Sequence, residues 1–219
     1  MQVSRTNNLA FGVKFKFLQN QVGLPCAYCG KPILSQIEFN DVYKALRNKK
    51  GKEIIPVLTP FLDRLEGDAQ SFLRTVLNCA QESKYSDWSF KKLSMLGQEK
   101  KIYTPNDVET LSNILKDIRF SVEHTEPQSL GGLNISSNYV PMHVGCNSKR
   151  SSYSYSEMSV QNPKFPENIR ACLAELKRRM ISDRLGKTHY DIRIQDDYFP
   201  KVTDSIVKQG IDRKWLSDI

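Results

Sequence analysis

Two groups of side chains in this 219-residue chain have the types and the spacing that chemistry requires. In the first group, Glu123 and His124 are neighbours, Asn138 follows His124 by 14 positions, and Asn147 follows Asn138 by nine. The imidazole of His124 is a candidate general base, because its usual pKa range lies near neutral pH. The group thus combines a base, a carboxylate and two amides in one short segment.

The second group consists of two ligand pairs that have the same internal spacing. Cys26 and Cys29 are separated by two residues in a turn marked by prolines and a glycine, and His143 and Cys146 repeat that spacing. Structural zinc is bound by four nitrogen or sulfur ligands in a tetrahedron, so the two pairs predict one complete zinc site. Such a site contributes roughly 10 kcal/mol or more to folding.

Other interpretations of the second group are open at this stage. Cys26 and Cys29 alone could form a redox pair, but the strand-then-helix pattern of such motifs is not apparent around them. His143 has a rival role, the contact of a phosphate beside the active site. The remaining cysteines, Cys79 and Cys172, lie within apolar helical stripes and are interpreted as buried core thiols.

Composition favours a soluble protein with an anionic partner. The net charge is +8, with 39% hydrophobic and 26% charged residues, and nucleic acid is the commonest partner of such a basic chain. The chain has no apolar run of membrane-spanning length and its first residues are polar, which predicts a cytoplasmic protein without a membrane. An odd number of cysteines, five, argues for thiols and a metal rather than disulfides.

Periodicity predicts a mainly helical chain around one small strand pair. Thr59–Pro60 and Thr104–Pro105 are typical of helix starts. Strands are expected at 119–124 and 138–142, with a loop over 127–137 between them and a helix opening at 146. Further along, a helix is expected over 166–185, a strand over 190–194 and a last short helix. The predicted segments are an N-terminal part with the first zinc pair (1–35), a helical insertion (36–118), a catalytic core (119–160) and a C-terminal helical region packed on the core (161–219).

The first group resembles the active site of the HNH endonucleases, also called ββα-metal nucleases. The resemblance is carried by Glu123–His124, Pro127, Gly131–Gly132, Asn138 and Cys146–Asn147, and it covers about 30 contiguous residues plus the upstream cysteine pair. It implies an α+β fold with a ββα-metal core, a zinc knuckle and a large helical surround. The chain departs from the family in having Glu123 where Asp is more usual, His143 where many members have Cys, and a long insertion.

The resemblance also implies a role for each residue of the site. His124 is the general base, Glu123 and Asn147 hold one magnesium or manganese ion, and Asn138 holds the glycine-rich loop that aims His124. The expected products are a 5′ phosphate and a 3′ hydroxyl.

Basic residues around this segment are candidate nucleic-acid contacts. Lys149 and Arg150 follow Asn147 by about one helical turn, and 177–179 (Lys177, Arg178 and Arg179) could follow a duplex backbone, although a solvated helix face is an equal interpretation. The expected function is hydrolysis of DNA, with RNA left open, as the nuclease component of a restriction or phage-defence system and with a targeting or regulatory protein partner. The alternative is a non-catalytic, zinc-stabilised nucleic-acid-binding protein or a subunit of a larger complex.

Overall fold

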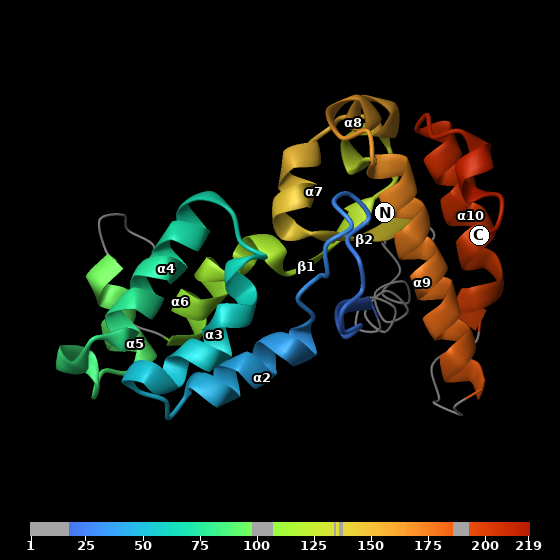
Figure 1. Ribbon diagram of the computed structural model, residues 1–219. Helices are drawn as coiled ribbons and strands as arrows, with labels where there is room; N and C mark the ends of the chain where they lie inside the picture. Colours follow the sequence, from blue (N-terminus) through green and yellow to red (C-terminus); the bar gives the residue numbers. More distant parts are fainter. Residues whose placement is uncertain (1–17, 98–106, 134, 136–137, 186–192) are drawn as a thin grey trace, which may run out of the picture. The chain divides into compact units, whose positions relative to one another are not determined.

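The computed structural model describes residues 18–97, 107–133, 135, 138–185 and 193–219, which form two compact units (Figure 1). Unit 1 combines residues 1–35 with 120–219, and unit 2 comprises residues 36–119. The bounds of unit 2 differ by one residue from those of the expected helical insertion. The other three predicted segments fall in unit 1, apart from Arg119.

The α and 3₁₀ elements of unit 2 are joined by short turns, and none of its described residues belongs to a β-strand. Its longest helix, α4, buries Phe72, Leu73, Val76, Leu77 and Ala80, and this three-and-four spacing places their side chains on one face. Short 3₁₀ turns separate the helices. The elements of unit 2 are α2 (Gln36–Leu46), η1 (Gly51–Ile54), α3 (Ile55–Leu62), α4 (Gly67–Gln81), η2 (Ser83–Tyr85), α5 (Phe90–Ser94), η3 (Met95–Gly97), α6 (Asp107–Ile114) and η4 (Lys116–Ile118).

The expectation that a helix starts at Thr59–Pro60 is wrong. Helix α3 begins at Ile55, with Pro56 in its first turn, and Pro60 lies inside it. The Thr59 hydroxyl donates a hydrogen bond of 2.8 Å to the Ile55 carbonyl, so this side chain bonds back into the helix instead of capping a new one. Thr104–Pro105 lies outside the described residues.

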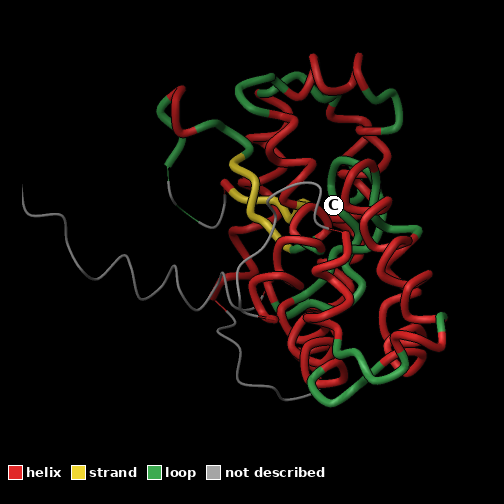
Figure 2. The backbone as a smooth tube through the Cα atoms, turned by 90° about the vertical axis from the view of Figure 1, so that its left-hand side faces the viewer, coloured by secondary structure: helices red, strands yellow, loops and turns green. Residues whose placement is uncertain are grey.

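Unit 1 is built around an antiparallel hairpin of β1 (Phe120–His124) and β2 (Tyr139–His143), which pairs Phe120 with His143 and His124 with Tyr139. Figure 2 shows the two strands among helices. Both strands were expected, and each expected end lies within one residue of the observed end. The hairpin loop contains η5 (Gln128–Leu130), and β2 is followed by α7 (Val144–Arg150), α8 (Tyr155–Gln161), α9 (Phe165–Leu185), α10 (Arg193–Lys208) and η7 (Arg213–Leu216).

The core of unit 1 lies between β2, α9 and α10. Helix α9 contributes a buried stripe with helical spacing, and the buried side chains of Val140 and Met142 on β2 belong to the same cluster. Helices α9 and α10 run side by side (Figure 1). Cys172 is fully buried within this core, as expected, whereas Cys79 in unit 2 is only half-buried. The stripe of α9 consists of Ile169, Cys172, Leu173, Leu176 and Met180.

The prediction of a strand over 190–194 is wrong for the two residues of that range that the structure describes. Arg193 and Ile194 are the first residues of α10, while 190–192 lie outside the described residues. The helix is favoured because buried residues recur at three-and-four spacing behind this point, at Phe199, Val202 and Ile206.

The chain is a mixed helix and sheet protein, as the expected α+β class requires. Among the described helices, none combines the length and the apolar composition that crossing a bilayer requires.

Candidate metal centre and adjoining hairpin site

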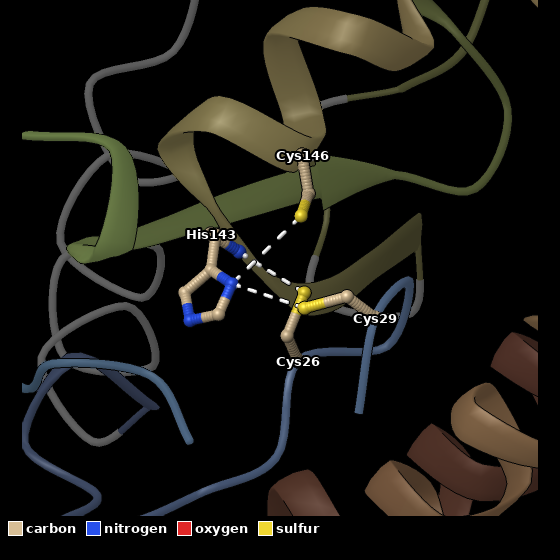
Figure 3. A group of neighbouring side chains, drawn as sticks. All are labelled: Cys26, Cys29, His143 and Cys146. Carbon is tan, nitrogen blue, oxygen red and sulfur yellow. Dashed lines mark hydrogen bonds between the residues drawn. The ribbon is translucent and has the colours of Figure 1, made fainter. Parts of the chain in front are cut away.

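The side chains of Cys26, Cys29, His143 and Cys146 converge on one point (Figure 3). Their ligand atoms all lie within 4.8 Å of one another, and His143 Nδ1 lies 3.3 Å from Cys29 Sγ and 3.8 Å from Cys146 Sγ. All five cysteines of the chain are free thiols. These four residues, here called the Cys₃His cluster, could therefore hold a metal ion, and three sulfurs with one imidazole suit zinc.

The first ligand pair lies in a tight turn that the backbone closes. Pro25 and Pro32 form an isolated bridge, and the Gly30 amide donates to the Cys26 carbonyl at 2.9 Å. Gly30 has a φ of +71°, which is the left-handed region that favours glycine. The turn thus directs both thiols of the pair to the same side.

Two backbone hydrogen bonds attach this turn to β2. The Ala27 amide donates to the Pro141 carbonyl at 3.0 Å, and the His143 amide donates to Cys26 Sγ at 3.3 Å. The second of these bonds joins a residue of one ligand pair directly to the ligand atom of the other. The two ligand pairs are therefore brought together by main-chain contacts as well as by their side chains.

The orientation of His143 identifies which ring nitrogen faces the cluster. Its Nε2 lies 3.0 Å from the Pro32 carbonyl oxygen, which can only accept, so Nε2 carries a proton. Nδ1 is then free to offer its lone pair to a metal, and a backbone carbonyl behind the ring is a common support for a metal-binding histidine. The ring is buried, with 4% exposed, which favours the metal role over contact with a phosphate.

The charges of the Cys₃His cluster are unbalanced without an ion. Hydrogen bonds from Cys146 and Cys26 hold the pKa of the Cys29 thiol well below its usual range, whereas hydrogen bonds with Cys26 and Cys29, together with burial, raise the pKa of Cys146. Burial lowers the pKa of His143, but its hydrogen bonds to Cys26 and Cys29 outweigh burial and raise that pKa to about 10. A divalent cation would resolve this competition, because the three thiols and Nδ1 of His143 could then all be without a proton while Nε2 keeps its own.

The hairpin loop is closed by the side-chain amide of Asn138, which is buried with 6% exposed. Its oxygen accepts from the Glu126 amide at 2.7 Å and from the Thr125 hydroxyl at 2.5 Å. Its nitrogen donates to the carbonyls of Glu126 at 2.9 Å and Leu133 at 3.0 Å. One residue thus joins both ends of the loop directly after His124; that it aims His124 remains a prediction.

The two glycines of the loop are required for different reasons. Gly131 has a φ of +94° and open space where a Cβ would stand. A Cβ on Gly132 would lie 1.8 Å from the Glu126 carbonyl oxygen, which is far inside van der Waals contact. The loop passes so close to its own beginning that only a residue without a side chain fits at 132.

Gly132→Ala is therefore expected to lower the free energy of unfolding by roughly 3 kcal/mol, since the backbone must move to admit the methyl group. The matched variant Gly131→Ala is expected to lower the free energy of unfolding by only about 1 kcal/mol, because alanine is disfavoured at a positive φ. Urea unfolding of both variants measures the difference. A Gly131→Ala cost equal to or larger than that of Gly132→Ala would contradict the close approach.

Asn147 is anchored to β1 from helix α7. Its side-chain nitrogen donates to Ser121 Oγ at 2.8 Å and to the Val122 carbonyl at 3.0 Å. No described residue donates a hydrogen bond to its oxygen, Oδ1. The amide is thus held by its nitrogen and presents an oxygen, the ligand type that magnesium prefers, at its other end.

Glu123 is paired with Arg150, the last residue of α7. The pair is buried, with 0% of the Arg150 side chain and 6% of the Glu123 side chain exposed. The Arg150 guanidinium also donates to the carbonyls of His124, Thr125 and Tyr153, and it stacks on the Tyr155 ring with 4.6 Å to the centroid. The expectation that Arg150 contacts a phosphate is wrong, because its donors are used inside the protein.

The arginine contact engages one carboxylate oxygen of Glu123. Arg150 Nη1 meets Oε1, and no described residue donates to Oε2. Asn147 and Arg150 are three positions apart on α7, so both face β1, and Glu123 lies on this same side of the strand. Two hard oxygens, Glu123 Oε2 and Asn147 Oδ1, are thus on the α7 side of β1.

His124 ends β1, and its ring packs edge-on against Tyr139, with 4.8 Å between ring centroids. Tyr139 is its partner across the hairpin. Because neighbouring residues of a strand point to opposite faces, the imidazole leaves β1 on the side opposite Glu123.

The basic residues of α9 have partners within unit 1. Arg178 and Arg179 both pair with Glu175, with 2.7 Å from each Nε to a carboxylate oxygen, and hydrogen bonds from these two arginines lower the Glu175 pKa to about 2. Arg179 also donates to the Val22 carbonyl, and Lys177 donates to the carbonyl of Ile219. These partners weaken the basis for nucleic-acid contact at Lys177, Arg178 and Arg179, which stays a prediction. Lys149, exposed on α7, remains a candidate.

Two features of the site had no recognisable signal in the sequence. The Thr125 hydroxyl, which donates to Asn138, lies 2.6 Å from Ser205 Oγ and so links the loop to α10. Ser151, directly after Arg150, has a φ of +51°, which is uncommon for a residue with a side chain. The residues around Thr125 give no indication that its partner lies on α10, and the residues around Ser151 give no indication of its positive φ.

Comparison with known proteins finds no family model, no curated protein and no solved structure that matches this chain. Its function is therefore inferred from its own residues and their geometry.

Proposed function

We propose that this protein is a metal-dependent endonuclease of the HNH type that hydrolyses DNA phosphodiester bonds. The observation that carries the proposal is the hairpin and helix unit β1–loop–β2–α7, in which Asn138 closes the loop, Asn147 is anchored to β1 and His124 ends that strand. Binding alone requires none of these residues as a set. Their presence together favours catalysis.

The two faces of β1 would serve opposite sides of the reaction. In an in-line displacement, the attacking and leaving oxygens lie on opposite sides of phosphorus. His124, on one side of the strand, would take the proton from the attacking water. Glu123 and Asn147, on the other side, would then face the leaving 3′ oxygen.

Glu123 Oε2 and Asn147 Oδ1 would hold one magnesium or manganese ion, since both are hard oxygen donors without a hydrogen-bond partner among the described residues. When bound, that ion supplies positive charge for the scissile phosphate and the leaving oxygen. Arg150 fixes the Glu123 carboxylate through Oε1 and so limits the positions that Oε2 can take. The Cys₃His cluster would hold a separate, structural zinc ion.

One observation favours a second candidate, a zinc-stabilised protein that binds nucleic acid without cutting it. The Glu123 carboxylate is already neutralised by a buried arginine, and a carboxylate in such a pair attracts a further cation less strongly. In this alternative, Glu123 and Arg150 only support the hairpin.

Nicking of supercoiled plasmid by the wild-type protein and by His124→Ala separates the two candidates. The wild type is expected to cut with added magnesium or manganese, and the variant is expected to lose at least 100-fold in rate while it binds DNA equally well. A wild type that binds DNA but cuts with neither ion supports the second candidate.

A further inference from the structure

Two segments of unit 2 that are far apart in the sequence lie side by side. The Gly51 amide donates to the Trp88 carbonyl at 2.9 Å, and Lys50 forms an isolated bridge with Ser89. A Cβ on Gly51 would lie 2.6 Å from the Ser86 carbonyl oxygen, so the two backbones are in direct contact. Residues 47–52 and 86–92 therefore form one continuous surface.

This surface carries a concentration of positive charge. Six of its side chains are exposed cations, and none of them has a carboxylate within ion-pair distance among the described residues; they are Arg47, Lys49, Lys50, Lys52, Lys91 and Lys92. These six residues are here called the basic surface. The one exposed acid of the same segments is Asp87, which leaves a net charge of +5, and Glu53 directly follows the first segment.

The cations of helix α9 differ from those of the basic surface in having partners within the protein. There, Arg178 and Arg179 share Glu175, and Lys177 donates to the chain itself. One carboxylate thus offsets part of the charge of this cluster, whereas no described carboxylate pairs with the six cations of the basic surface. Among the described residues, these six cations without a carboxylate partner therefore lie on the helical unit and not on the helix that sequence alone indicated.

The chemistry of the basic surface fits a polynucleotide backbone. Five of its six cations are lysines, which act as point charges toward phosphates and need no fixed geometry. Tyr85 and Trp88, with ring centroids 4.8 Å apart, lie in the adjoining segment and offer half-exposed rings to bases. A lipid surface fits less well, because stable anchoring needs apolar groups too, and the one large apolar side chain of segments 47–52 and 86–92 that reaches the surface, Trp88, is only half-exposed.

We propose that the basic surface binds the phosphate backbone of nucleic acid and increases the affinity of the chain for its substrate without selecting a sequence. The choice of nucleic acid as the partner rests on the proposed function. The basic surface would contribute to the affinity for nucleic acid alone. The chemical step proposed at His124 would not depend on it.

The test uses the full chain and two charge-matched variants, with binding to a labelled 30-base-pair duplex measured by fluorescence anisotropy between 50 and 300 mM salt. No divalent ion is added, so the duplex stays intact. The surface variant combines Lys49→Gln, Lys50→Gln, Lys91→Gln and Lys92→Gln. The control variant removes the same charge at four other exposed lysines, of which three have a carboxylate partner, through Lys44→Gln, Lys84→Gln, Lys116→Gln and Lys214→Gln.

The surface variant is expected to bind at least tenfold more weakly, with a slope of log K against log salt that is smaller by about three, because each lost phosphate contact removes roughly 0.9. The control is expected to change affinity less than threefold. Equal weakening of both variants would overturn the proposal, since net charge alone would then explain the effect. Unchanged duplex binding, with reduced binding to phosphatidylserine vesicles or to an acidic protein, would also overturn it.

The two proposals fail separately in this experiment. A wild type that binds through the basic surface but never cuts plasmid refutes the nuclease and leaves the basic surface intact. A wild type that cuts, with a surface variant that binds as tightly as the control, refutes only the basic surface.

Discussion

Cys29→Ala is expected to lose the bound zinc and most of the stability of unit 1. A structural zinc site contributes about 10–16 kcal/mol of apparent binding free energy, which is comparable with the whole stability of a typical domain. Loss of one thiolate also leaves the buried His143 ring, the buried Cys26 thiol and the half-buried Cys146 thiol without their common partner. Zinc analysis of the purified protein and thermal melting followed by circular dichroism measure both effects.

The matched control is Cys79→Ala. Cys79 is a half-buried free thiol on α4 and takes no part in the Cys₃His cluster. This variant is expected to keep one zinc per chain and to melt within a few degrees of the wild type. A Cys29→Ala protein that retains stoichiometric zinc and melts like the control would show that the cluster is not a structural metal site.

Arg150→Met is expected to lower the free energy of unfolding by about 3–5 kcal/mol. The substitution keeps a long, flexible side chain but leaves the Glu123 carboxylate buried and unpaired, and removal of one partner of a buried ion pair has a cost of this size. It also removes the donors to the carbonyls of His124 and Thr125. Urea denaturation followed by fluorescence measures the change.

A double-mutant cycle with Glu123→Gln identifies the origin of that loss. Glu123→Gln and Arg150→Met together are expected to cost clearly less than the sum of the two single changes, with a coupling of about 1–3 kcal/mol. Simple additivity of the two costs, or a cost below 1 kcal/mol for Arg150→Met alone, would mean that the buried pair contributes little.

Local sequence patterns predicted the elements that position the site. The strands were found within one residue because turn-forming glycines and Pro127 separate two short apolar segments, and these signals act between near neighbours. The Cys₃His cluster followed from two repeated spacings, because a tetrahedral ion constrains ligand type and number regardless of the chain between.

Contacts between residues that are far apart in the sequence could not be predicted from such local patterns. Arg150 and Lys149 are adjacent in sequence and equally basic, yet one is buried against Glu123 and the other is exposed. The difference depends on the face of α7 that meets β1, which is a property of tertiary packing. Similarly, Arg179 donates to the carbonyl of Val22, which lies 157 positions away in the sequence.

Whether one divalent ion lies between Glu123 and Asn147 is measured directly by titrating the zinc-loaded protein with manganese and following free Mn²⁺ by electron paramagnetic resonance. The wild type is expected to bind one Mn²⁺ per chain, and Asn147→Ala and Glu123→Gln, each shown to be folded, are expected to weaken that binding at least tenfold. A wild type that binds no Mn²⁺, or folded variants that bind it as tightly as the wild type, would contradict the proposed active site.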